Sequence, residues 1–228
     1  MADAFSTSST CRTPVPGGGT YWYHPHLGSP EQVGRGLYGA LIIEEREPPK
    51  VDRDLVWVLS DWRLDRQARN VGDFRNFMDA SHAGRIGNTV TVNGAVRDDF
   101  AVRAGERVRL RLLNASNARI YGLRFEGHDP WVVALDGHPV EPHRGERVVL
   151  GPGMRADLIV DCAGAPGSAH RVIDDFYARR AYELLKLAYS GEPPLRPESG
   201  PPPRLPENPV AEPDIARRSA TASYSQAA

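Results

Sequence analysis

Short β-type runs alternate with turn residues along most of the chain, and their spacing constrains the fold more than any other feature. Between residues 55 and 189, turn signals return about every 8–12 residues, which is typical of a β-sandwich. The strands expected there are residues 55–59, 89–92, 100–102, 107–113, 120–125, 131–135, 147–150, 156–160 and 181–189. The sequence therefore predicts an all-β fold with about seven or more strands in this span.

Residues 107–113 are the clearest of these runs, because apolar residues alternate with Arg107, Arg109 and Arg111. Successive side chains of a strand point to opposite faces of the sheet. We therefore expect the apolar face of this strand to be buried and the arginine face to lie in water.

Four segments lack a strand pattern. Residues 1–13 are small and polar and predict a loose leader. Residues 48–54 are charged and contain two prolines, which indicates an interdomain linker. Residues 60–87 are polar and irregular, and we expect a long surface loop with a helical turn. Residues 191–228 begin with dense proline, which favours an extended linker, and end without apolar periodicity, which predicts a disordered tail.

The charge balance argues against general nucleic-acid binding, because 28 lysines and arginines stand against 29 aspartates and glutamates, a net charge of −1. No apolar run reaches the ~18 residues of a membrane-spanning helix, so no membrane span is expected. Residues 1–13 also lack the charged and apolar regions of a secretory signal. Cys11 and Cys162 could form one disulfide or remain two free thiols, and the sequence leaves both open.

His24 and His26 stand in the string YWYHPH at residues 21–26, whose aromatic residues favour an extended strand. Residues two apart on a strand share a face, with Cα atoms roughly 6.5–7 Å apart. Two imidazoles at that spacing can enter one metal site or each reach one ion of a close cluster. Pro25 lacks an N–H group, so we expect a sheet edge or rim here. Two ordinary hydrogen-bonded histidines are the alternative.

The wider string around this pair resembles the first cupredoxin domain of the multicopper oxidases, the family of the laccase-like enzymes. The resemblance rests on GTYWYHPH at residues 19–26 and GLYGALII at residues 36–43. In that family the string is one of four copper motifs, and both of its histidines bind the paired type 3 coppers of a trinuclear centre. The resemblance implies that His24 and His26 are type 3 copper ligands, and imidazole nitrogen suits copper.

A second block resembles the second cupredoxin domain of the same family. Its matching strings are VNG at 92–94, RLRLLNAS at 109–116, EGHDP at 126–130, ALDG at 134–137 and GPGMRAD at 151–157. The resemblance implies cupredoxin-like Greek-key β-sandwich domains. We expect the C-terminal part of a truncated domain 1 at residues 1–47, a linker at 48–54, domain 2 at 55–190 and a Pro-rich linker with a disordered tail at 191–228.

The family's chemistry needs more copper ligands than these strings contain. Its complete members couple one-electron oxidation of a reducing substrate (phenol, amine or metal ion) to the reduction of dioxygen to water. They also use a His-Trp-His-Gly motif and a His-Cys-His motif at the type 1 copper, and this sequence contains neither. We therefore expect no type 1 site, no catalytic residue and no activity from this chain alone, as in a gene fragment, a frameshifted reading or half of a split enzyme.

The other histidines carry weaker signals. The family places no copper at the position of His128, which we expect to be packed or hydrogen-bonded in the core. His138 and His143 flank a turn and are expected in solvent. His82 and His170 are expected in loops.

Three functions remain open. The first is a multicopper oxidase, with dioxygen and a reducing small molecule or metal ion as partners of the complete enzyme and with a periplasmic or secreted location implied by the resemblance. The second is a non-catalytic cupredoxin-like binding or scaffold protein that has lost copper ligands. The third is a small zinc or copper module that uses His24 and His26 with a ligand from another chain. Exposed strand edges of a truncated first domain would favour association.

Overall fold

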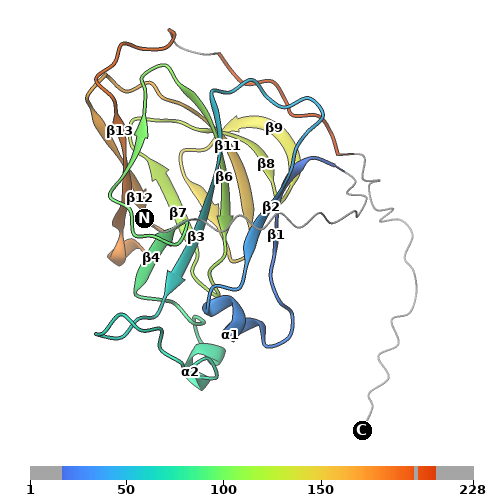
Figure 1. Cartoon of the computed structure of the whole chain (residues 1–228), viewed down its shortest axis with the longest axis vertical. Helices are drawn as coiled ribbons and strands as arrows, with labels where there is room; N and C mark the ends of the chain where they lie inside the picture. Colours follow the sequence, from blue (N-terminus) through green and yellow to red (C-terminus); the bar gives the residue numbers. More distant parts are fainter. Residues whose placement is uncertain (1–16, 198–199, 209–228) are drawn as a thin grey trace, which may run out of the picture.

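Strands dominate the regular structure of the computed structural model, which describes residues 17–197 and 200–208 (Figure 1). The expected leader, residues 1–13, and the end of the expected tail, residues 209–228, lie outside the described residues. In chain order the elements are β1 Gly19–Tyr23, α1 Ser29–Gly34, β2 Gly39–Ile43, β3 Arg53–Trp62, α2 Phe77–Ser81, β4 Thr89–Val92, β5 Asp99–Val102, β6 Arg107–Asn114, β7 Tyr121–Phe125, β8 Trp131–Leu135, β9 His138–Arg144, β10 Val148–Leu150, β11 Arg155–Asp161, β12 Ala169–Asp174, the short 3₁₀ helix η1 Ala178–Arg180 and β13 Tyr182–Tyr189.

The strands from β3 onward form two sheets. One has six strands in the order β4-β3-β6-β11-β8-β9, and the other has five in the order β10-β7-β12-β13-β5. Neighbouring strands are antiparallel except for the parallel pairs β3–β6 and β5–β13. The two sheets pack face to face, which confirms the predicted all-β, cupredoxin-like sandwich (Figure 1).

The core lies between the two sheets and is built by the alternation of each strand. Leu110 and Leu112 of β6 point inward and are almost completely buried. Trp57 of β3 lies edge-on to Phe100, with 5.3 Å between ring centroids, and stacks at 6.5 Å on Phe125 of the opposite sheet. These aromatic contacts join the two sheets and give the sandwich its own hydrophobic core.

Four elements were not predicted, namely α1, β9, β12 and the short η1. The helix α1 follows the histidine pair, and β12 places His170 in a strand and not in the expected loop. The strand β9 contains two prolines, which a central strand does not tolerate. It is accommodated because it is an edge strand of the six-stranded sheet. In addition, β3 begins at Arg53, inside the segment read as a linker.

The Pro-rich segment after β13, which was expected to be an extended linker, lies against the sandwich where the structure describes it. In Figure 1 it runs from the β13 side over the top of the molecule toward β8. Leu205 is only 4% exposed and packs on Val133 and Ile159. Asn208 donates a hydrogen bond of 2.7 Å from Nδ2 to the carbonyl oxygen of Gly137. The segment is therefore part of the folded unit as far as residue 208.

An ion pair holds the start of this segment. Arg196 donates from Nη2 to Oδ1 of Asp52 at 2.6 Å. The hydrogen bonds from Arg196 lower the pKa of Asp52 to about 2, although partial burial opposes this shift. Because the folded-state pKa is lowered, the contribution of Asp52 to stability is present above its unfolded pKa and is lost as the pH falls toward 2.

We expect Leu205→Ala to loosen this segment. Loss of a buried leucine side chain costs about 2–5 kcal/mol, so the rate at which trypsin cuts after Arg204 should rise at least about tenfold. Mass spectrometry of the cleavage products over time gives that rate. Leu195→Ala is the matched control, because Leu195 lies in the same segment but is 45% exposed. Equal cleavage of the two variants would contradict the role given to Leu205.

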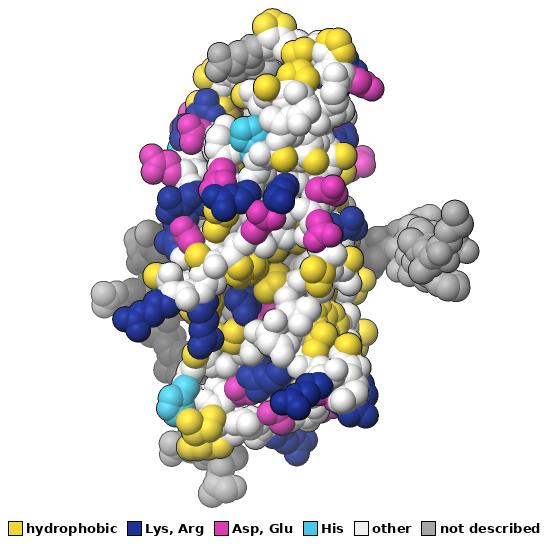
Figure 2. Space-filling model, turned by 90° about the vertical axis from the view of Figure 1, so that its left-hand side faces the viewer, with side chains coloured by type: hydrophobic (Ala, Val, Ile, Leu, Met, Phe, Trp, Pro, Cys, Tyr) yellow, Lys and Arg dark blue, Asp and Glu magenta, His cyan; other side chains and the backbone are white. Residues whose placement is uncertain are grey.

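The surface over β12 and β13 carries mixed charge. Figure 2 views this side and shows lysine and arginine interspersed with aspartate and glutamate. Arg171, for example, binds both carboxylate oxygens of Glu126 at 2.7 Å. This face therefore lacks the continuous basic patch of a nucleic-acid interface. None of the helices in the described residues is long and apolar enough to cross a membrane.

Candidate metal centre

The predicted histidine pair follows a two-stranded hairpin. The strand β1 pairs with β2 in antiparallel register, from Gly19 opposite Ile43 to Tyr23 opposite Gly39. The strand ends at Tyr23, so His24 and His26 come after it; the expectation that the strand extends to residue 26 is wrong. Two causes act together: β2 offers no residue beyond Gly39 to pair with, and the proline that follows has no N–H group.

The two imidazole rings lie on one side of the chain, as predicted. The ring centroids of His24 and His26 are 4.8 Å apart, and the ring planes differ by 25°. The indole of Trp22 stacks on His24 from the other side at 4.1 Å. Trp22 in turn rests on the turn at Gly153, where a Cβ atom would lie 3.2 Å from its Cζ2. The stack therefore begins on the sandwich and ends at His26.

The ring nitrogens of this pair are largely free of protein partners. Nδ1 of His24 lies 3.4 Å from the carbonyl oxygen of Pro25, which leaves Nε2 available. His26 is exposed and makes no hydrogen bond with the described residues. Neutral imidazole nitrogens are common metal ligands and suit copper. Two close, uncommitted imidazoles thus fit a copper ion or a pair of neighbouring copper ions.

No group of three or more histidine, cysteine, aspartate or glutamate side chains is placed to hold a metal ion among the described residues. His82, His138 and His143 are exposed. Within this part of the chain, the candidate centre consists of His24 and His26.

His128 is a hydrogen-bonded core histidine, as predicted. It is 8% exposed, and its Nε2 accepts a hydrogen bond of 2.5 Å from the hydroxyl of Tyr189. Its Nδ1 donates to the carbonyl oxygen of Glu126 at 2.8 Å. Burial lowers the pKa of His128, which keeps the ring neutral. Both nitrogens are therefore occupied, and His128 has none to offer a metal.

Cys162 is a buried free thiol at the end of the core. Burial, reinforced by the nearby charge of Glu106, raises its pKa to about 12. A metal ligand must be the thiolate, so this environment disfavours metal binding by Cys162 at neutral pH. Cys11 lies outside the described residues, so one disulfide and two free thiols both stay open.

The arginine face of β6 is buried, so the prediction that it lies in water is wrong. Arg109 is 0% exposed and Arg111 is 2% exposed. The hairpin of β1 and β2 covers this face, and β1 contacts β11 while β2 contacts β3. Arg109 Nη2 lies 2.6 Å from both Glu45 Oε1 and Asp157 Oδ2. We call Glu45, Arg109, Arg111 and Asp157 the ionic cluster.

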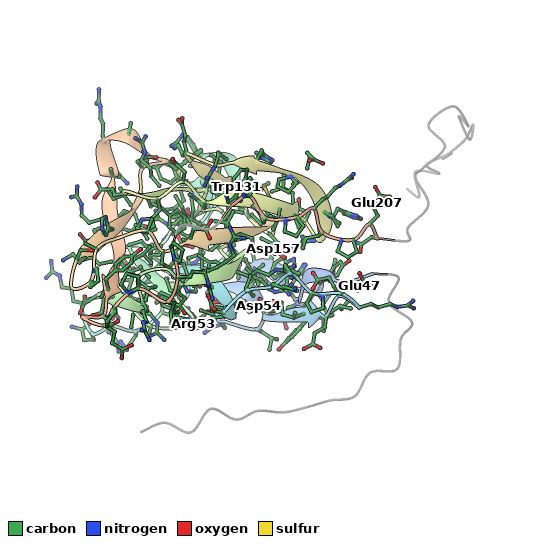
Figure 3. All side chains as sticks on the ribbon, turned by 90° about the horizontal axis from the view of Figure 1, so that it is seen from above. Glu47, Arg53, Asp54, Trp131, Asp157 and Glu207 are labelled. Atoms are coloured by element: carbon green, nitrogen blue, oxygen red, sulfur yellow. The ribbon has the colours of Figure 1, made fainter. Side chains whose placement is uncertain are left out.

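The ionic cluster reaches from the centre of the sheet to the hairpin. Figure 3 shows Asp157 between Trp131 of β8 and Asp54 of β3. Arg111 donates from Nε and Nη2 to the two carboxylate oxygens of Asp54, at 2.7 and 2.8 Å. On the hairpin side, the hydroxyl of Thr20 donates to Asp157 Oδ1 at 2.6 Å. The cluster therefore connects β1, the strand that precedes the histidine pair, to two central strands.

The charges of the cluster are matched. Burial of Glu45 alone would raise its pKa, but the hydrogen bonds from Arg109 and the charges of Arg109 and Arg111 outweigh burial and lower it. The stabilisation from Glu45 is therefore complete above its unfolded pKa of about 4.3 and is lost as the pH falls through the lower folded-state value. The lowered pKa keeps the Glu45 carboxylate ionised, and its ion pair with Arg109 intact, at neutral pH.

Comparison with known proteins places this geometry in a family. The multicopper oxidase model matches residues 53–194, and a second multicopper oxidase model matches residues 6–48. The chain belongs to the multicopper oxidase family. The boundary between the two matched regions falls between β2 and β3, where the hairpin ends and the sandwich begins.

Several multicopper oxidases are similar to this chain. It is 27% identical to multicopper oxidase MmcO of Mycobacterium tuberculosis over 68% of the chain and 36% of that protein. It is 29% identical to copper resistance protein A of Escherichia coli over 75% of the chain and 35% of that protein. The solved multi-copper oxidase of Pseudomonas thermotolerans superposes with a TM-score of 0.78 at 37% identity, over 88% of this chain and 47% of that one.

The chain spans about a third of the length of these curated multicopper oxidase relatives. The family implies copper as the cofactor, and the donor set of His24 and His26 fits that metal. The ionic cluster was missed in the sequence. Its signal was present, because carboxylates able to pair with the arginine stripe stand at Glu45 and Asp157, but only the fold brings them to one face.

Proposed function

We propose that His24 and His26 are copper ligands of the type 3 pair in a multicopper oxidase. The observation that carries this proposal is the stack in which the two rings lie 4.8 Å apart with ring nitrogens left free. In the complete enzyme, copper would supply electron transfer to dioxygen, and these side chains would hold and orient it. Further ligands would come from residues outside the described part of the protein or from another chain.

The same proposal covers the organisation of the complete protein. Residues 1–47 would belong to the first cupredoxin domain and residues 55–190 to the second. The complete enzyme would oxidise a phenol, an amine or a metal ion and reduce dioxygen to water, in the periplasm or outside the cell. Membership of the family supports this assignment.

The rival hypothesis of a non-catalytic scaffold is less well supported. A scaffold has no need for two neighbouring imidazoles that keep ring nitrogens free of hydrogen bonds among the described residues, and such nitrogens can bind metal. The hypothesis of a small zinc or copper module uses the same two residues with a third ligand from another chain. Metal preference does not separate it, because copper binds above zinc at most sites of this kind.

Removal of the pair tests the proposal. We expect the double variant His24→Ala/His26→Ala to lose the copper that the unaltered chain retains, a fall in affinity of about tenfold or more, because both imidazole donors are gone. Copper is titrated against a chromophoric competitor chelator, and bound metal is measured after gel filtration.

The matched control is the double variant His138→Ala/His143→Ala, which removes two exposed histidines of β9. It should bind copper as the unaltered chain does. Equal losses in the two double variants would show that copper binds to exposed histidines in general, and the assignment to His24 and His26 would then be wrong.

A further inference from the structure

We propose that Thr20 is a positioning residue that fixes the histidine pair through the ionic cluster, an inference that rests on the copper-binding function proposed above. Thr20 stands four residues before His24 and touches neither imidazole. Its side chain is fully buried between the hairpin and the six-stranded sheet. The role given to it is therefore to hold β1, the strand that leads into the two ligands.

The Thr20 hydroxyl both donates to and accepts from buried charged groups. The hydroxyl donates to Asp157 Oδ1 at 2.6 Å and accepts from Arg111 Nη1 at 3.1 Å. Hydrogen bonds to ionised partners are shorter and stronger than neutral ones. A threonine buried only for packing would need one modest partner, whereas this hydroxyl is held from two sides.

The charged partners of Thr20 lie on two paired strands. Asp157 of β11 and Arg111 of β6 stand opposite each other in the antiparallel register of two central strands. Arg109 braces the same carboxylate, with Nη2 at 2.6 Å from Asp157 Oδ2. The hydroxyl of Thr20 is therefore bound to side chains of the two central strands of the six-stranded sheet.

Other hydrogen bonds also attach the hairpin to the sandwich, among them Arg155 Nε to the carbonyl oxygen of Thr20 at 3.2 Å and the hydroxyl of Tyr38 to Ser60 at 2.7 Å. Removal of the Thr20 hydroxyl therefore tests the contribution of its contacts to the ionic cluster alone. Within the described residues, β1 hydrogen-bonds as a strand only to β2. Thr20 and Trp22 lie on the same face of β1, because residues two apart share a face. Trp22 rests on Gly153 and carries His24 and then His26 in the stack. The ionic cluster thus holds Thr20 in place. Thr20 fixes β1, whose Trp22 supports the two imidazole rings.

Metal sites are sensitive to small displacements of their ligands, and groups that hold the ligands in place typically affect metal affinity by about 10–100-fold. We therefore expect Thr20→Val, which keeps the shape and removes the hydroxyl, to weaken copper binding by about tenfold. We expect Thr20→Ser, which keeps the hydroxyl, to restore it. Recovery by serine separates hydrogen bonding from side-chain volume.

The experiment measures Cu(II) affinity by competition titration and the electron paramagnetic resonance spectrum of the bound ion. The unaltered chain should show nitrogen couplings from two imidazoles, and Thr20→Val should show a changed coupling pattern. Thr91→Val is the matched control, because Thr91 is also a buried strand threonine whose hydroxyl bonds a side chain, the indole N–H of Trp62 at 3.0 Å. It should alter stability and leave the copper spectrum unchanged.

The outcomes separate the two proposals. If His24→Ala/His26→Ala does not reduce copper binding, the proposed function fails. If that variant loses copper while Thr20→Val keeps the affinity and spectrum of the unaltered chain, the positioning role fails and the proposed function stands. Should Thr20→Val unfold, Asp157→Asn, which keeps an acceptor but removes the charge, takes its place. An unchanged affinity and spectrum in that variant overturns the positioning role.

Discussion

Arg109→Met lowers the free energy of unfolding by about 3–5 kcal/mol, because removing one partner of a buried ion pair leaves uncompensated charge in the interior. Arg109 is 0% exposed and is the 2.6 Å partner of both Glu45 and Asp157. After the change, Arg111 alone must balance both carboxylates. Methionine fills similar space, so the loss reports charge and not a cavity. Urea unfolding followed by tryptophan fluorescence measures it.

The control is Arg171→Met, which breaks the surface pair with Glu126. Those side chains are 54% and 35% exposed, and exposed ion pairs contribute little. This variant should unfold close to the midpoint of the unaltered chain. If the two variants are equally stable, the ionic cluster does not hold the hairpin in the way that its geometry indicates.

Copper added to the 228-residue chain should produce no intense blue absorption, and the sample should not consume dioxygen with a phenolic substrate. The blue colour requires a cysteine thiolate and two histidines on one copper ion. The pKa of Cys162 is raised to about 12, so its thiol is protonated at neutral pH. Cys11 has Arg12 beside it and no neighbouring histidine. A visible spectrum and an oxygen-electrode trace on one sample make the measurement.

A complete multicopper oxidase serves as the positive control for both the visible spectrum and the oxygen-electrode trace. The same sample of the 228-residue chain should still show weak copper binding through His24 and His26. Stoichiometric copper with a blue band and steady oxygen uptake would show that this chain assembles a full set of ligands, for instance between subunits. The ligand count within one chain would then be the wrong basis for judging activity.

Much of the fold follows from local pattern. The sandwich and most of its strands were predicted, because period-2 patterns such as that of β6, short apolar runs such as that of β11 and turn residues are read locally. The strand β9 was not, because its prolines oppose a strand in general and are tolerated only at an edge. Edge position depends on strand order, which short-range pattern does not contain.

The candidate centre was also predicted only in part. His24 and His26 were found because they stand two apart in one string, and their shared side follows from that spacing. Arg109 and Arg111 were assigned to water because alternating charge looks the same on an exposed face and on a covered one. Their partner Glu45 lies 64 positions before Arg109 in the sequence. Only tertiary structure shows that the hairpin lies over them.

The hydrogen bond between Thr20 and Asp157 joins residues 137 positions apart. On a ribosome that adds about 5–20 residues per second, β11 follows the two histidines by roughly ten seconds. The hairpin has no sheet to rest on before β6 and β11 pair, and such distant pairings form slowly. His24 and His26 are thus synthesised well before the contacts that fix their position can form. Copper offered to the nascent chain would meet two loose imidazoles, so ordered loading of the proposed site would follow the closure of the sandwich.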